Sequence, residues 1–277
     1  MTQLERTTGS VWTRKPARQI GTRRFERYVV RTHLVRPGER LTATLLPYLA
    51  GQVRPDDIVV VGEKVVAIAE GRAIPLRAVR PRPLARWLAR YVRPLGYGLG
   101  LRRPETMEMA LREAGVARIL LAAAVAAVGR LLGRSGDFYR IAGRRVASID
   151  GPGPTTIPPY NRYIVLAPRQ SQNFADGLAR RLGCGVAVVD VNDVGSEVLA
   201  HSAGVDASLV RELLRDNPMG QGGQRTPVAV LRPAATADEP RWPRLEPPRP
   251  HPLPAAVAGL GFGLEETEPG SPDAHVG

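Results

Sequence analysis

Hydrophobic and polar residues recur along this chain with two different periods, which predicts a mixed α and β fold. A period of two, typical of strands, begins at about residue 24 and continues to about Val35, where Pro37 and Gly38 turn the chain. Further strand patterns lie at 58–72 (a β-rich pair around Gly62), 137–151 (a hairpin), 162–168, 186–192 and 228–232. Helical spacing is found at 41–53, 83–92, 103–115, 171–183 and 208–217.

Residues that begin and end helices support two of these predictions. Pro104 lies just inside the start of one helix and Gly115 just past its end, an arrangement typical of helix boundaries. Ser171 is the expected N-cap of the helix at 171–183. Residues 116–136 are rich in alanine and leucine and predict a buried helix, or a helix and a strand, between which periodicity does not decide.

Both ends of the chain differ in composition from the middle. Residues 1–23 are polar and basic, and we expect a disordered basic arm there. From residue 233 onward ten of 45 residues are proline, which predicts a Pro-rich disordered tail over 233–277. A single folded domain of the α/β (mixed α+β) class is therefore predicted over 24–232.

The charge of the chain is strongly positive and uneven. The net charge is +13, and only Lys15 and Lys64 are lysines, so the other basic residues are arginines. A GC-rich genome accounts for such usage, and a retained lysine such as Lys64 then stands out. Residues 72–103 carry nine arginines and no acid, a pattern that attracts nucleic acid, an anionic membrane or phosphorylated and carboxylated small molecules. A solvated arginine-rich surface is the alternative.

Several function classes are disfavoured. The lone Cys184 predicts neither a disulfide framework nor a cysteine metal site. The first residues lack the apolar core of a signal peptide, and the longest uncharged apolar stretch, 119–129, falls short of the roughly 20 residues that a membrane span needs. We expect a soluble, cytoplasmic protein without a membrane partner. The four histidines show no metal spacing, and no phosphate-binding loop, serine-nucleophile or zinc-protease motif occurs.

Oxygen-bearing side chains are the remaining candidates for chemistry. The apolar run "VAVVDVNDVG" ends in Asp190, Asn192 and Asp193, and ligands of α/β proteins gather at such carboxyl ends of strands. Asp150 follows another predicted strand, and the glycines after Met219 would let backbone N–H groups approach phosphates. Converging carboxylates suit Mg²⁺ or Mn²⁺ with a nucleotide. A strand-ending Asx turn is the structural alternative.

Five blocks of the chain, in order, resemble the coenzyme F-420-0:L-glutamate ligases (γ-glutamyl ligases). They are "RPDDIVVVGEKVVAIAEGR", "RPETMEMALREAG", "IDGPGPTTIPPYNRYIVLAP", "FADGLARRLGCGVAVVDVNDVG" and "NPMGQGGQRTPVAVLR". The similarity covers roughly residues 28–232. It implies a two-lobed, homodimeric enzyme that uses GTP and Mn²⁺ or Mg²⁺, with K⁺ as an additional candidate ion. Such a ligase activates the lactyl carboxylate of a phosphorylated deazaflavin as an acyl phosphate, which the amine of L-glutamate attacks to give an amide, GDP and phosphate.

The resemblance also assigns roles to individual residues. The positions that match metal ligands of the family are Asp150, Asp193 and Gln221. The positions that match nucleotide contacts are Thr32, His33, Leu34, Val35, Glu63, Lys64, Gly220 and Gln221. No residue is assigned a direct catalytic role.

Two departures from the family pattern bear on activity. Ile68 stands where the family has the lysine of S-K-A-E-G-R, and Val194 stands where it has the threonine of S-D-T. These changes favour a divergent member, and they also support a non-catalytic regulator that keeps the fold to bind a nucleotide or another ligand. A nucleic-acid-binding function rests on charge alone, because no interleaved aromatics or known motif accompany it.

Overall fold

The computed structural model describes residues 11–234, except 93–99, 135, 154–155, 193–194 and 221. The Pro-rich tail expected over 233–277 lies almost entirely outside the described residues, as does the beginning of the predicted basic arm. Residues 1–234 and 235–277 are separate units, and all of the described helices and strands belong to the first.

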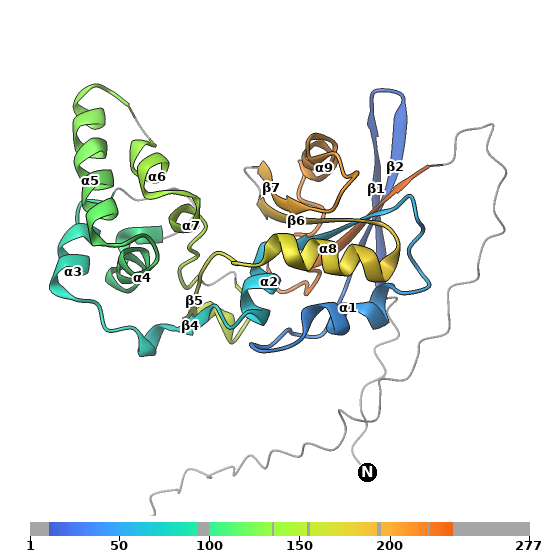
Figure 1. Cartoon of the computed structure of the whole chain (residues 1–277), viewed down its shortest axis with the longest axis horizontal. Coiled ribbons are helices and arrows are strands. Elements are labelled where there is room, and N and C mark those ends of the chain that lie inside the picture. Colours follow the sequence, from blue (N-terminus) through green and yellow to red (C-terminus); the bar gives the residue numbers. More distant parts are fainter. Residues whose placement is uncertain are drawn as a thin grey trace, which may run out of the picture. The chain divides into compact units, whose positions relative to one another are not determined.

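A six-stranded mixed sheet forms the centre of one lobe, which we call the sheet lobe (Figure 1). Its strand order is β1-β2-β8-β3-β6-β7, and β3 and β6 are parallel whereas the other neighbouring pairs are antiparallel. The strands are β1 (Trp12–Ile20), β2 (Arg23–Val30), β3 (Ile58–Gly62), β6 (Gly185–Asn192), β7 (Gly195–His201) and β8 (Val228–Pro233). The helices packed on this sheet are α1 (Leu41–Leu49), α2 (Glu63–Ala69), α8 (Ser171–Leu182) and α9 (Ala207–Leu214).

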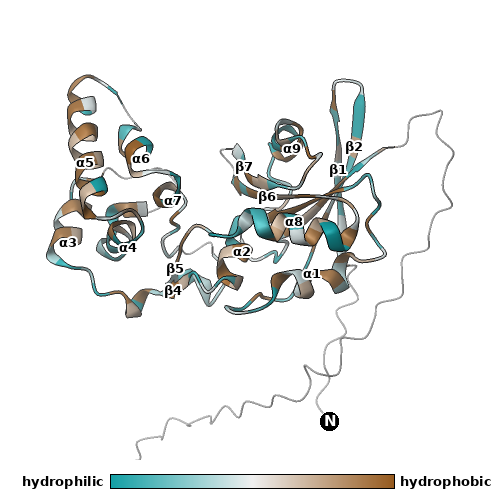
Figure 2. Cartoon of the chain, viewed as in Figure 1, coloured by the Kyte–Doolittle hydropathy of each residue, from teal (hydrophilic) through white to brown (hydrophobic). Residues whose placement is uncertain are grey.

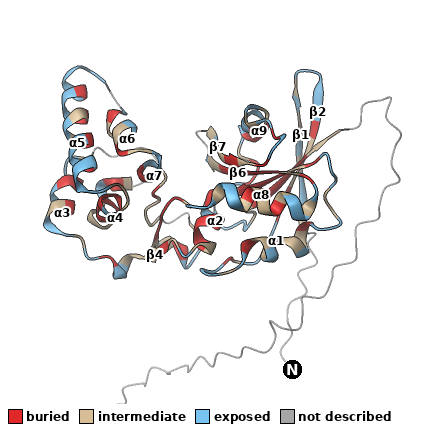
Figure 3. Ribbon diagram, in the orientation of Figure 1, coloured by how far each residue is buried: buried red, intermediate tan, exposed pale blue. Residues whose placement is uncertain are grey.

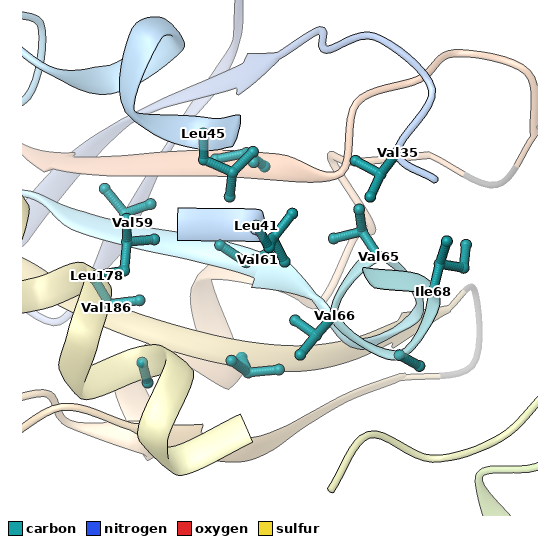
Figure 4. Packing of buried hydrophobic residues seen from close by; sticks show 14 of the residues in the cluster. Val35, Leu41, Leu45, Val59, Val61, Val65, Val66, Ile68, Leu178 and Val186 are labelled. Atoms are coloured by element: carbon teal, nitrogen blue, oxygen red, sulfur yellow. The ribbon is translucent and has the colours of Figure 1, made fainter. Parts of the chain in front are cut away.

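Alternating side chains of the central strands fill two cores, one on each face of the sheet. Val59, Val61, Val186 and Val188 pack with α1, α2 and α8 in what we call the α8-side core (Figure 4). Their neighbours along the strands, Val60 and Ala187 among them, pack with α9 on the other face. Because helices cover both faces of the sheet, successive residues of β3 and β6 are apolar without alternation. These strand residues are buried (Figure 3).

A second, helical lobe is inserted between the two strands of a small antiparallel ribbon. The ribbon strands are β4 (Ala73–Pro75) and β5 (Tyr163–Val165). The helices of the lobe are α3 (Pro83–Ala89), α4 (Pro104–Ala114), α5 (Val116–Leu131), α6 (Asp137–Ala142) and α7 (Arg144–Ala147), with 3₁₀ turns at Leu76–Ala78, Gly100–Arg102 and Tyr160–Arg162. These helices share a core of their own, to which Ile164 of β5 belongs.

Several predicted elements are confirmed. Helices α1, α3, α4, α8 and α9 and strands β3, β5, β6 and β8 lie where the pattern placed them. Pro104 is the first residue of α4, and Gly115 ends it with φ of +83°. Ser171 is the first residue of α8 rather than its N-cap, which is Gln170.

Residues 12–20 of the predicted basic arm form strand β1, so that part of the prediction is wrong and the folded domain begins before residue 24. Strand β1 lies at the edge of the sheet, and most of its side chains are charged or polar and are not buried. Its sequence therefore lacks the alternation of apolar and polar residues that predicts a strand. Backbone pairing with β2 holds the strand, and the indole N–H of Trp12 donates to the carbonyl of Tyr48 at 3.0 Å. Strand β2 ends at Val30, earlier than the predicted Val35.

Two segments predicted as β structure are helical. The second half of 58–72 is α2, in which the β-branched Val65, Val66 and Ile68 are buried, so packing overrides their intrinsic preference. The predicted hairpin at 137–151 contains α6 and α7, joined at Gly143 with φ of +94°. Ala142, Val146 and Ile149 of this segment are buried in the core of the helical lobe, and Phe138, Tyr139 and Ile141 pack against that core.

Residues 116–131 form one helix, α5, which confirms the first of the two predictions for this segment, a helix alone rather than a helix and a strand. Only one side of α5 is buried. Its exposed residues include Leu120, Leu121, Val128 and Leu131, and the helix is hydrophobic on its outer side as well as its inner side (Figures 2 and 3). Among the described residues no single helix has the length and apolarity to cross a membrane. The α4–α5 pair, bent by 114°, meets those criteria only when both helices are taken together.

Candidate functional site at the carboxyl edge of the sheet

The carboxyl ends of three strands lie at the same edge of the sheet. Strands β2 and β3 both run antiparallel to β8, and β3 runs parallel to β6, so all three point in one direction. Val61 is in register with both Val228 and Val188, and Val30 with Val228. The residues that come after these positions therefore converge, as expected for a ligand site in an α/β protein.

Glu63, the first residue after β3, is a buried carboxylic acid at this edge. Only 5% of the residue is exposed, and its Oε2 has no hydrogen-bond partner in the part of the chain that the structure describes. Burial, together with the negative charges of Asp190 and Asp150, raises the pKa of Glu63 to about 9, against the opposing effect of Lys64 and Arg144. Glu63 is therefore protonated at neutral pH unless a cation neutralises it.

Lys64 forms an ion pair with Asp150, which comes after the last helix of the helical lobe. Its Nζ lies 2.9 Å from Oδ2 of Asp150, and both side chains are about half exposed. Asp150 is fixed by a backbone bridge to Val165 of β5, with N–H to O distances of 2.9 and 3.0 Å. Burial lowers the pKa of Lys64, but attraction to Asp150, Asp190 and Glu63 outweighs this and raises it, so Lys64 carries a charge.

Asp190 of β6 completes a group of three carboxylic acids, which we call the carboxylate cluster (Glu63, Asp150 and Asp190). Burial raises the pKa of Asp190, as does the negative charge of Asp150, whereas Lys64 and Arg144 oppose the rise. Arg144 of α7 forms an exposed ion pair with Glu197 of β7 at 2.9 Å. Sequence reasoning had noticed Asp190 but selected Asp193, and it had no signal for Arg144 or Glu197.

The donor chemistry of the carboxylate cluster fits a hard divalent cation. Its oxygens are of the kind that Mg²⁺ and Mn²⁺ bind, and the unpartnered Oε2 of Glu63 is a free acceptor. Within the described residues no three His, Cys, Asp or Glu side chains are placed to hold an ion by themselves. The cluster therefore suits an ion that takes one or two carboxylates and completes its shell with phosphate oxygens and water.

The segment after β2 lies near this edge, with its side chains engaged in structural contacts. Thr32 is buried, and its backbone N–H donates to the carbonyl of Arg225 at 3.0 Å. The imidazole of His33 lies 3.0 Å from the Tyr48 hydroxyl and 3.0 Å from a carboxylate oxygen of Glu39. Leu34 and Val35 pack in or against the α8-side core. Within the described residues these four form no hydrogen bond or ion pair with the carboxylate cluster.

The glycine-rich loop before β8 reaches the same edge. The backbone N–H of Gly62 donates to the carbonyl of Pro227 at 2.9 Å, which attaches the end of the loop to the end of β3. Gly220 has φ of +77°, and a Cβ there would lie 3.1 Å from the Gln224 side chain, so glycine is required by the turn. The structure thus brings Glu63, Lys64 and Asp150 together and places the Gly220 loop beside them.

Three positions that the sequence singled out, Asp193, Val194 and Gln221, lie outside the described residues, so the assignment of a metal to Asp193 and Gln221 stays a prediction. Ile68 is 8% exposed and packs in the α8-side core (Figure 4). Position 68 therefore supplies no cation to the carboxylates, which have Lys64 and Arg144 near them instead. Cys184 is buried, and burial raises the pKa of its thiol to about 11, which leaves it an unreactive core residue.

Comparison with known families agrees with this architecture. The sequence model of the family F420-0:Gamma-glutamyl ligase matches residues 29–208, well over half of the chain. The chain belongs to this family. Among curated proteins the comparison found no match. Membership of the γ-glutamyl ligase family indicates a ligase role in the biosynthesis of coenzyme F-420, and the matched range includes all three acids of the carboxylate cluster.

The first of the five blocks that resemble the family, residues 54–72, also has a structural function. Glu70 accepts backbone hydrogen bonds from Arg169 and Gln170, at 2.7 and 3.0 Å, where α8 begins. Arg72 pairs with the buried Glu113 at 2.8 Å. The E-G-R sequence of the γ-glutamyl ligase pattern therefore links the end of α2 to the start of α8 and to α4 in this chain.

The buried acid predicts a pH dependence of stability. Since the pKa of Glu63 rises from an ordinary 4.5 to about 9 on folding, the unfolded chain loses this proton first. The free energy of unfolding should therefore fall as pH rises from about 4.5 towards 9, and Glu63 should cause no further loss above that. Glu63→Gln, which mimics the protonated acid, should flatten this slope in thermal unfolding measured in metal-free buffer between pH 5 and 9.5. The exposed Glu212→Gln is the control, and an unchanged slope in Glu63→Gln would contradict the prediction.

Proposed function

We propose that the chain is a metal- and GTP-dependent ligase that adds L-glutamate to a phosphorylated deazaflavin or a related acceptor through an acyl phosphate. The observation that carries the proposal is the carboxylate cluster beside Lys64 at the carboxyl edge of the sheet. Family membership supports the ligase reaction. The GTP, the Mn²⁺ or Mg²⁺, K⁺ and the acceptor are parts of the proposal.

The chain's own residues have distinct tasks in this reaction. Asp150 and Asp190, with Asp193 of the family pattern, would hold the divalent ion, which would neutralise phosphate charge on a bound nucleotide. Glu63 would give up its proton when that cation arrives, since the positive charge cancels the repulsion from the neighbouring carboxylates. Lys64, held by Asp150, would orient an anionic group of the nucleotide or of the acyl phosphate. The Gly220 loop offers backbone N–H groups at the same edge.

A non-catalytic regulator that binds a nucleotide is the second candidate. It is favoured by the burial of Ile68, because the cation that the family pattern has at this position is replaced by a core residue. Both candidates bind GTP, and only the ligase consumes it in the presence of an amino acid and an acceptor.

Two measurements test the proposal in order. Isothermal titration with GTP, with and without Mn²⁺, should show metal-dependent binding that Asp150→Ala and Asp193→Ala both abolish. GDP release should then require both L-glutamate and the deazaflavin acceptor. Metal-dependent binding without turnover, across a set of amino acids, would instead support the regulator. The proposal includes a homodimer, and light scattering after size exclusion should give twice the chain mass.

A further inference from the structure

Three arginines of the helical lobe line one cavity. The cavity has a volume of about 480 Å³. Its walls are Arg86 and Ala89 of α3, Arg90 at the C-terminal end of that helix, Arg102 of the 3₁₀ turn and Pro104, the first residue of α4. None of these lining residues is acidic. A space of this size accommodates a small-molecule ligand up to about the size of a nucleotide.

Some arginines of the lobe, Arg118 and Arg145 among them, have no ion pair within the described residues, and the three that line the cavity are of this kind. Arg86, Arg90 and Arg102 form no ion pair with any residue that the structure describes. By contrast, neighbouring arginines are neutralised by buried acids, in the pairs Arg72–Glu113, Arg82–Glu108, Arg112–Glu108 and Arg140–Asp137. Three like charges around one space repel each other, and a bound anion would remove that repulsion.

The start of α4 adds to the positive potential of the cavity. Pro104 is the first residue of this 11-residue helix, and its N-cap, Arg103, makes no side-chain capping hydrogen bond. The first turn of a helix carries partial positive charge on N–H groups that lack acceptors. Glu105, the one acid in that turn, lies 3.7 Å from Arg103. Thr106 is completely buried, and its Oγ1 has no hydrogen-bond partner among the described residues.

The same segment contacts the loop that comes after Asp150. A Cβ at Gly151 would lie 3.4 Å from Thr106 Oγ1 and 3.8 Å from the carbonyl of Gly100. The short stretch from Gly100 to Thr106 therefore contributes to the arginine cavity and also touches the residue next to Asp150. A ligand in the cavity would therefore contact the same stretch of chain that touches the residue after Asp150.

We propose that the arginine cavity binds a small oligo-anion that carries phosphate, either alone or with carboxylate. Two sources could supply this chemistry: the phosphate-bearing part of the acceptor, or the phosphates of a nucleotide. The contact between the segment 100–106 and Gly151 favours the acceptor, a refinement that rests on the proposed function. Anion binding by the arginine cavity does not depend on the proposed function.

Titration with inorganic pyrophosphate, in buffer freed of divalent cations at about 0.15 M salt, tests the site directly. The double variant Arg86→Gln/Arg102→Gln should weaken binding at least about tenfold, because two charge-assisted contacts are lost. The control, Arg180→Gln/Arg181→Gln on the exposed side of α8, removes the same charge and should change affinity less than about twofold. Arg90→Lys keeps the charge without the guanidinium fork and should give an intermediate loss. Circular dichroism checks that each variant is folded.

Equal weakening in the cavity and control variants, or none in either, would overturn the proposal.

A competition experiment then distinguishes the two sources of the anion, the acceptor and the nucleotide. Displacement of pyrophosphate by phospholactate, and not by GTP, assigns the cavity to the acceptor, whereas the reverse assigns it to the nucleotide and overturns the refinement. Pyrophosphate binding that depends on Arg86 and Arg102 would support the site even if ligase turnover is never detected. Failure of the proposed function and failure of this site therefore give different results.

Discussion

Asp150→Asn is expected to abolish metal-dependent GTP binding and to lower ligase turnover by at least about 100-fold, comparable to the loss of one stabilising group for developing charge. Asparagine keeps the shape and the backbone bridge to Val165. It removes the negative charge that pairs with Lys64 at 2.9 Å and that contributes to the carboxylate cluster. GTP titration with Mn²⁺ and the GDP release assay are the measurements.

The matched control for Asp150 is Asp56→Asn. Asp56 is exposed and precedes β3, at the opposite end of the strand from Glu63. It should leave both GTP binding and turnover unchanged. Nucleotide binding that survives in Asp150→Asn with the same dependence on Mn²⁺ would exclude Asp150 as a ligand of the ion.

Asp57→Ala is expected to lower the free energy of unfolding by about 3–5 kcal/mol, because it leaves a largely buried guanidinium without its counterion. The Asp57 side chain is fully buried, and its two oxygens accept from Nε and Nη2 of Arg232 at 2.8 and 2.6 Å. It also accepts from the backbone N–H of Arg54 at 2.8 Å. Arg232 lies on β8, so this pair joins β8 to the turn before β3. Urea unfolding followed by circular dichroism gives the value.

An exposed ion pair provides the comparison for Asp57. Arg14 and Glu26 lie 2.6 Å apart across β1 and β2, with 61% and 30% of their side chains exposed. Arg14→Ala should cost less than about 1 kcal/mol, since water screens such pairs. A loss in Asp57→Ala no larger than that in Arg14→Ala would show that Arg232 finds another partner or reaches solvent.

Much of the carboxylate cluster could be expected from sequence, and one part of it could not. The family blocks pointed to Glu63, Lys64 and Asp150, and the structure places Lys64 in contact with Asp150. Asp190 is also identifiable as an acid in an apolar strand, but its partners are not. Glu197 faces Asp190 across the neighbouring strands β6 and β7 and is close to it in sequence, whereas Arg144 comes from α7, whose approach depends on how the two lobes fold. The contact with Arg144 therefore has no local sequence pattern.

The arginine-rich segment illustrates the same limit. Its nine arginines at 72–103 are evident from the sequence, which does not choose among nucleic acid, membrane and small anions as their partner. Tertiary structure divides them: Arg72 and Arg82 neutralise buried acids, while Arg86, Arg90 and Arg102 line a cavity. Whether a given arginine pairs with a buried acid or lines the cavity depends on acids that are distant in the chain.

The sequence by itself determined the family, the buried strands β3 and β6, and helices such as α4 whose ends are marked by proline and glycine. The strands and helices depend on local periodicity and on short-range backbone preferences, whereas the parallel pairing of β3 with β6 came from the structure. Only the tertiary structure decided that residues 12–20 are a strand, that 63–69 and 137–147 are helical, and which acids share the sheet edge. Those outcomes depend on burial against residues far away in sequence, and burial can override local preference and move a carboxylic acid's pKa by several units.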